Sequence, residues 1–204
     1  MRLFFCGILM LSFSCAAFAA GDPEQAVRDA QSAIDAKNAD RFEQLVDVGR
    51  ILGTATDLLL AEADRPDGRL PPILAIMLSS VKDSQALAGL RTLITREIHI
   101  FVRYGILSGN FAGKPDQSVR PGGMLAPLFS NASLGRKELR IAGPSSPDGN
   151  DQVFLPVELK DCGNGNTYPL LLRLQRNSTD WRITEIVNLP DIWDAIQAEA
   201  KAQQ

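Results

Sequence analysis

Cysteine and histidine are scarce in this chain of 204 residues, which contains three cysteines and one histidine. Two of the cysteines, Cys6 and Cys15, lie in the first 20 residues, so the remaining chain keeps only Cys162. A lone cysteine cannot form a disulfide within its own chain, and its Gly- and Asn-rich neighbours predict an exposed turn. A Ser-His-Asp or Cys-His enzyme would depend entirely on His99.

Familiar catalytic and cofactor-binding motifs are also missing. The sequence has no HExxH metal motif, no GxSxG nucleophile motif, no GxGxxG dinucleotide motif and no phosphate-binding loop. The formal net charge is −3, with acidic and basic residues interspersed rather than gathered into blocks. Such a charge pattern does not suit a polyanionic partner. We therefore predict no cofactor, no metal site and no nucleic-acid partner.

The first 20 residues have the pattern of a cleavable secretory signal peptide. Arg2 is followed by an apolar run over 3–13 and then by small residues over 14–20 with Ala-x-Ala character. The apolar run is too short to span a bilayer, which takes about 20 residues. We expect cleavage after Ala19 or Ala20, no transmembrane segment after cleavage, and a protein that is exported to the periplasm or secreted.

The remaining chain, 21–204, has a size that normally forms one domain and needs no disulfide for stability. Its first half has helical periodicity, with helices predicted over 27–34, 42–52, 54–63 and 71–81. The longest predicted helix begins at Ser84 as its N-cap and ends near Leu107. Apolar residues cover more than half of its circumference, so we expect it to pack on two sides. Its polar strip, expected to face water or a groove, consists of Thr92, Thr95, Arg96, His99 and Arg103.

The last third of the chain changes to a period of two, which is typical of strands. Apolar residues alternate over 139–141, 153–159, 170–174 and 181–183, and turn-forming residues connect these segments. We predict an antiparallel meander, closed by a helix over 191–200. A long loop rich in Gly and Pro, 110–136, joins the helical half to the strands.

This order of elements resembles the NTF2-like (cystatin-like cone) superfamily. The resemblance is carried by residues 33–40, by Phe42 with the Leu-Val-Asp of 45–47, and by the strand Asp-Trp-Arg-Ile-Thr-Glu-Ile at 180–186. It implies an α+β fold with N-terminal helices and a long central helix packed on a curved antiparallel sheet of three to four strands. Members use the pocket inside the cone for catalysis or for binding small apolar molecules, or fill it with side chains, so the fold alone does not settle the function.

Glu97 is a carboxylate inside an apolar arc of the long helix. Its neighbours one and two turns away are Leu90, Leu93, Ile94, Ile100, Phe101 and Tyr104. Burial in a pocket could make it the general acid or base of a hydratase or isomerase. Because buried charges are normally compensated, we predict instead that Glu97 lies between the helix and the inner face of the sheet, paired with an arginine such as Arg136, Arg140 or Arg173.

The sequence thus predicts an exported, non-catalytic module that binds a small molecule or a protein partner in the cell envelope. Two alternatives stay open: a carrier of an apolar ligand or lipid, and a hydratase or isomerase that uses Glu97. An open pocket between helices and sheet would favour the carrier. The candidate ligand-binding residues are Phe42, Leu90, Glu97, Phe101, Leu155 and Leu172.

Overall fold

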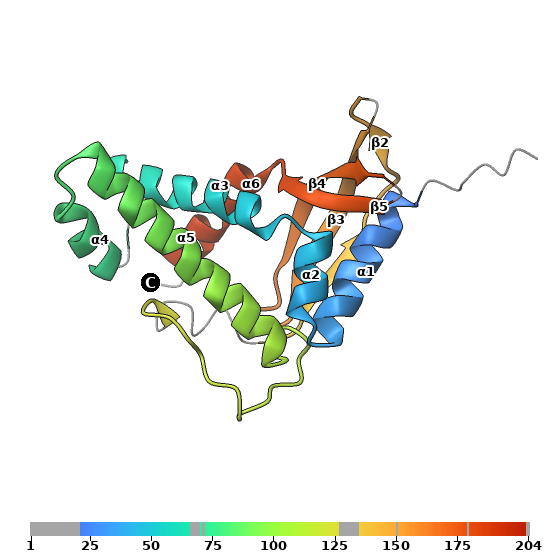
Figure 1. Ribbon diagram of the computed structural model, residues 1–204, viewed down its shortest axis with the longest axis horizontal. Helices are drawn as coiled ribbons and strands as arrows, with labels where there is room; N and C mark the ends of the chain where they lie inside the picture. The colour runs from blue at the N-terminus through green and yellow to red at the C-terminus, as the bar shows by residue number, and fades with distance from the viewer. Residues whose placement is uncertain are drawn as a thin grey trace, which may run out of the picture.

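The computed structural model describes residues 21–65, 70, 72–126, 135–149, 151–178 and 180–202, and the predicted signal peptide lies outside them. Helices come first and strands follow, with one more helix at the end (Figure 1). The helical elements are α1 (Pro23–Asp35), α2 (Ala39–Leu45), α3 (Val48–Ala61), the short η1 (Glu62–Asp64), α4 (Pro72–Ser79), α5 (Ser84–Leu107) and α6 (Leu189–Ala202). The strands are β1 (Lys137–Ile141), β2 (Ser146–Pro147), β3 (Gln152–Asp161), β4 (Thr167–Asn177) and β5 (Asp180–Ile186).

The predicted α+β class is confirmed. The strands form one curled antiparallel sheet in the order β1-β3-β4-β5, and the short β2 also pairs with β3. The alternation of apolar residues places Leu155 and Val157 of β3 opposite Leu172 and Leu170 of β4, and all four are buried. Pairing between β4 and β5 is irregular near Arg173, which bends the strands there. The curled sheet therefore presents one apolar face to the helices.

The boundary between α2 and α3 differs from the prediction. A continuous helix over 42–52 was expected, but Val46 is extended and forms a parallel bridge with Ile183. The N–H of Asp47 donates to the carbonyl of Ile183 at 2.7 Å, and the Asp47 side chain then caps α3 by accepting from the N–H of Arg50 at 3.2 Å. Pairing with a distant strand thus overrides the local helical period, and 54–61 continues α3 rather than forming a separate helix.

The long helix α5 ends where the periodicity predicted, although its N-cap is Asp83 rather than Ser84. The Asp83 side chain accepts from the N–H of Ala86 at 2.8 Å. Its expected packing on two sides is confirmed. Leu90 and Ile94 belong to a cluster with Leu74 of α4 and Leu125 of the following loop, whereas Val102 contributes to the core next to the sheet.

A side chain of α1 contacts the backbone of the edge strand β1. Gln31 accepts from the N–H of Leu139 at 2.8 Å and donates to the carbonyl of Lys137 at 3.3 Å. An edge strand otherwise presents unpaired backbone groups that can recruit another chain. One glutamine therefore satisfies both a donor and an acceptor of β1.

Replacing Gln31 with leucine should lower the free energy of unfolding by about 1 to 2 kcal/mol, because two half-buried backbone groups lose their partner while the side-chain size is kept. Urea unfolding measures this loss. Gln44→Leu on the exposed side of α2 is the matched control and should change stability by less than about 0.5 kcal/mol. Equal effects of the two substitutions would contradict the capping role.

Candidate functional site

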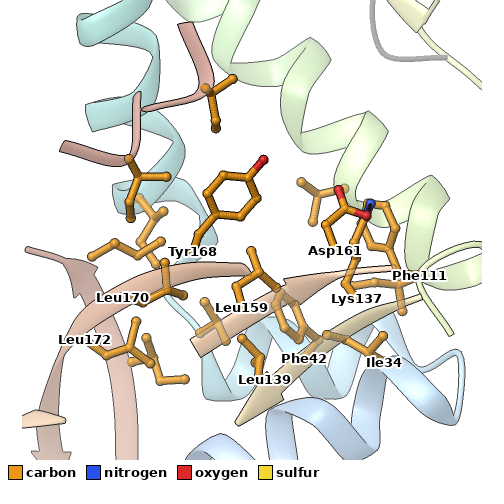
Figure 2. Close-up of a pocket in the computed structure, with 18 of the residues that line it drawn as sticks. Ile34, Phe42, Phe111, Lys137, Leu139, Leu159, Asp161, Tyr168, Leu170 and Leu172 are labelled. Carbon is orange, nitrogen blue, oxygen red and sulfur yellow. Dashed lines mark hydrogen bonds and ion pairs between the residues drawn. The ribbon is translucent and has the colours of Figure 1, made fainter. Parts of the chain in front are cut away.

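A cavity of about 760 Å³ lies between α5 and the inner face of the sheet (Figure 2). Aliphatic and aromatic side chains from both halves of the chain form most of its wall. The sheet contributes Leu139, Leu159, Tyr168, Leu170, Leu172 and Ile183, and the link between α2 and α3 contributes Val46. The helices and the loop after α5 contribute Ile34, Phe42, Ile51, Phe101, Val102, Ile106, Phe111, Ile192 and Ile196. The wall is therefore predominantly apolar.

The C-terminal half of α5 and the loop that follows form one side of this cavity. The rings of Phe101 and Phe111 pack edge to face, with their centroids 5.8 Å apart at 76°. Phe111 can approach the helix because Gly105 has no side chain, and an added Cβ there would lie only 2.3 Å from the Phe111 ring. A glycine in α5 thus lets the loop fold back and extend the apolar wall.

One end of the cavity is polar. Lys137 of β1 and Asp161 of β3 are register partners on the inner face, and their charged atoms are 2.5 Å apart. Both side chains are largely buried, with 13% and 18% of their surface exposed. Asp161 also accepts from the N–H of Gly163 at 2.8 Å, and the Lys137 ammonium lies 5.9 Å from the centre of the Phe111 ring. Figure 2 shows this ion pair beside the apolar lining.

A second polar group at the same end joins β4 to α6. The hydroxyl of Tyr168 donates to Glu199 Oε2 at 2.9 Å, and Asn166 donates to the same oxygen at 2.7 Å. Asn164 donates to the Tyr168 hydroxyl at 3.2 Å. Asn164 is exposed, and the lining residue Ile196 is 42% exposed, whereas Leu170 and Leu172 are buried. The polar end is accordingly the mouth of the cavity.

Three of the six candidate ligand-binding residues line this cavity: Phe42, Phe101 and Leu172. Leu90 does not, because it faces α4 on the other side of α5. Leu155 is fully buried in the main core and does not reach the cavity surface. Apolar residues of helices and sheet converge on the cavity, but the sequence did not show which of them pack together and which line its wall.

Glu97 is buried, as predicted, with 5% of its surface exposed, but it does not lie against the sheet. It points toward the loop after α5, where its Oε2 accepts from the N–H of Leu125 at 3.0 Å. Its neighbour Arg96 lies 3.6 Å away from Oε1 but is 65% exposed. The predicted position of Glu97 is therefore wrong, and it is not part of the cavity wall.

The three arginines predicted to compensate Glu97 have other partners. Arg136 pairs with Asp35 and Glu138, Arg140 pairs with Glu138, and Arg173 pairs with Asp148 and Glu185. An arginine does pair with Glu97, but none of the three named ones does, because the prediction assumed that Glu97 and the strands share one interface. The carboxylate is instead stabilised by a backbone N–H and by the arginine next to it in sequence.

The polar strip of α5 was expected to face either water or a groove. It faces α2, α3 and a surface groove of about 310 Å³. His99 Nε2 and Arg103 Nη1 both lie 2.8 Å from Glu43 Oε1. Burial acts to raise the pKa of Glu43, but hydrogen bonds from Arg103 and His99 outweigh it and bring that pKa below its ordinary value. This cluster joins α5 to α2, and its polar groups are engaged with one another.

The charged residues at the mouth were missed by sequence reasoning, although a signal for them exists. Lys137 is in phase with the inward-facing Leu139, and Asp161 is in phase with Leu159. Oppositely charged residues at inward positions of neighbouring strands predict an ion pair across the two strands, on the inner face of the sheet. Continuing the alternation by one step at each strand end would have found them.

Cys162 lies in the turn after β3 and is a free, exposed thiol, which confirms its predicted setting.

Among the described residues, no helix combines the length and apolar character needed to cross a membrane. In the same part of the chain, no three His, Cys, Asp or Glu side chains lie close enough together to bind a metal ion. Comparisons with models of known protein families, with curated proteins and with solved structures found no match to this chain.

Proposed function

We propose that this protein binds one small, mainly apolar molecule in the cavity between α5 and the sheet, as a non-catalytic binding module or carrier. The observation that carries the proposal is the cavity itself, with its apolar wall and its mouth at the polar end. Its volume of about 760 Å³ is within the range of ligand pockets, about 300 to 1,000 Å³.

Energetics favour an apolar ligand in this cavity. The cavity opens to solvent at its polar end, so water can reach its apolar wall. Burying apolar surface that water can reach is favourable by about 25 cal/mol per Å². An apolar molecule of the right size is therefore expected to bind there.

The cavity volume also limits the size of the ligand. If each non-hydrogen atom takes about 30 Å³, as a water molecule does in the liquid, the space holds on the order of 25 such atoms. One alkyl chain, a small terpenoid or a fused-ring compound is of this size. The concave wall favours such a molecule over a protein partner, whose binding surface is broader.

The hydratase or isomerase alternative has no comparable support. Glu97 lies outside the cavity, and its Oε2 already accepts from the N–H of Leu125. A general acid or base must lie within hydrogen-bond reach of the substrate.

We also propose that the ligand is bound outside the cytoplasm, in the periplasm or after secretion. The signal-like pattern over 1–20 supports this location.

A fluorescent apolar dye, N-phenyl-1-naphthylamine, tests the proposal directly. The purified protein should bind one dye molecule per chain, with enhanced emission. Val102→Trp places an indole in the cavity and should weaken dye binding about tenfold or more, because it removes volume and apolar contact. It should leave the melting temperature unchanged or raise it, since filling a cavity commonly stabilises.

Ala88→Trp is the matched control, because Ala88 is exposed on the same helix and away from the cavity. This variant should bind the dye like the unaltered protein. Absence of dye binding by the unaltered protein would contradict the proposed function. A destabilised Val102→Trp would also contradict it, since the cost of overpacking would show that the space is already filled.

A further inference from the structure

We propose that the cavity selects an amphiphile whose polar end is uncharged and bears a hydroxyl or amide, and that it rejects the carboxylate of the same chain length. This inference rests on the proposed function and adds the chemical class of the ligand. Among the described lining residues, the charged side chains all lie at the mouth: Lys137, Asp161 and Glu199. One cation and two anions therefore meet the polar end of any ligand whose chain occupies the apolar wall.

The Lys137 ammonium already forms an ion pair within the protein. Lys137 and Asp161 are 2.5 Å apart on adjacent strands, and both are largely buried. A ligand carboxylate could take the ammonium only by leaving Asp161 buried without its counter-charge, which is strongly unfavourable. Lys137 is thus no receptor for an anion while Asp161 is present.

The second carboxylate makes the mouth still less favourable for an anion. Glu199 Oε2 accepts from two uncharged donors, the Tyr168 hydroxyl and the Asn166 amide. These bonds satisfy one oxygen without cancelling the negative charge. A ligand carboxylate at the mouth would meet this charge in a partly desolvated setting, where repulsion is stronger than in bulk water.

An uncharged polar group has the opposite fit. A hydroxyl can donate to a carboxylate oxygen of Asp161 or Glu199 and accept from the exposed Asn164 amide, so both of its roles can be satisfied. It also enters the cavity with less loss of hydration than an ion does. The apolar wall then supplies the affinity, and the mouth supplies the selectivity.

Displacement of N-phenyl-1-naphthylamine by 1-dodecanol and by dodecanoate at pH 8 tests the inference. We expect dodecanol to bind at least about tenfold tighter than dodecanoate. This ratio corresponds to a difference of about 1.4 kcal/mol in binding free energy. Equal binding, or tighter binding of dodecanoate, would overturn the inference. If the dye and dodecanol bind, such a result leaves the proposed function intact; if neither binds, the proposed function itself fails.

Two variants test the residues. Asp161→Asn removes the negative charge beside the Lys137 ammonium and should tighten dodecanoate binding about tenfold while dodecanol changes by less than about threefold. Glu199→Gln keeps the acceptor oxygen, removes the negative charge and should reduce the preference for dodecanol several-fold. This second variant applies if Asp161→Asn does not fold.

Glu158→Gln is the control, since Glu158 is exposed on the outer face of β3 and the substitution makes the same change in net charge. It should leave the preference unaltered. A shift in Glu158→Gln equal to that in Glu199→Gln would show that overall charge rather than the mouth sets the selectivity, and would overturn the inference.

Discussion

Glu97→Ala should lower the free energy of unfolding by about 3 kcal/mol, because it removes a buried acceptor and leaves a void. The carboxylate is 5% exposed and its Oε2 accepts from the N–H of Leu125 at 3.0 Å. Leu125 is itself buried, in the cluster that joins α4 to α5. Loss of this bond leaves the N–H without its acceptor, and equilibrium unfolding in urea measures the cost.

Glu97→Gln separates the hydrogen bond from the charge. The amide oxygen can still accept from Leu125, and only the interaction with the exposed Arg96 is lost, so the decrease should stay below about 1 kcal/mol. A rise in stability on Glu97→Gln would show that the carboxylate is held at a cost in the native state. Such a result would reopen the enzyme alternative, at a site outside the cavity, because strained polar groups are often functional.

Gly109→Ala should destabilise the protein by about 3 kcal/mol, from the sum of a strained backbone and a steric clash. Gly109 follows the end of α5 with φ at +72°, and an added Cβ would lie 2.3 Å from the carbonyl oxygen of Lys114. The clash is with backbone, which cannot move aside as a flexible side chain can. Because the turn positions Phe111 in the cavity wall, dye binding should weaken as well.

Gly149→Ala isolates the backbone component of this effect. Its φ is +96°, but an added Cβ would meet no atom within 4 Å, and the residue is exposed. We expect a loss of about 1 kcal/mol from conformational strain alone, with no effect on dye binding. If thermal or urea unfolding showed equal losses for the two variants, the clash at Gly109 would not contribute.

The elements of the fold could be predicted because their signals are local. The apolar period of 3.6 identified α5 to its last residue, and the period of two identified β3, β4 and β5 within a few positions. The boundary at Val46 could not be found in this way. Its extended conformation depends on Ile183, which is far away in sequence, and no local period records a distant strand pair.

The position of Glu97 shows the same limit at the level of a single side chain. Helical periodicity correctly placed it inside an apolar arc, and hence in the interior. The apolar arc of α5 has two different neighbours, however, the sheet on one side and α4 with its adjoining loop on the other. Periodicity gives the angle between side chains around a helix axis but not the identity of the element that covers each angle.

By itself, the sequence determined the α+β class, the order of the elements, the burial of Glu97 and the exposure of Cys162, because each depends on residue type and short-range spacing. Tertiary structure alone decided that Leu172 faces a cavity while Leu155 is packed, and that the mouth of this cavity lies beside the cross-strand pair of Lys137 and Asp161. Hydrophobicity establishes which side chains leave water. Whether they fill the space they enclose depends on the distance between α5 and the sheet, which is set by the packing of all the elements together.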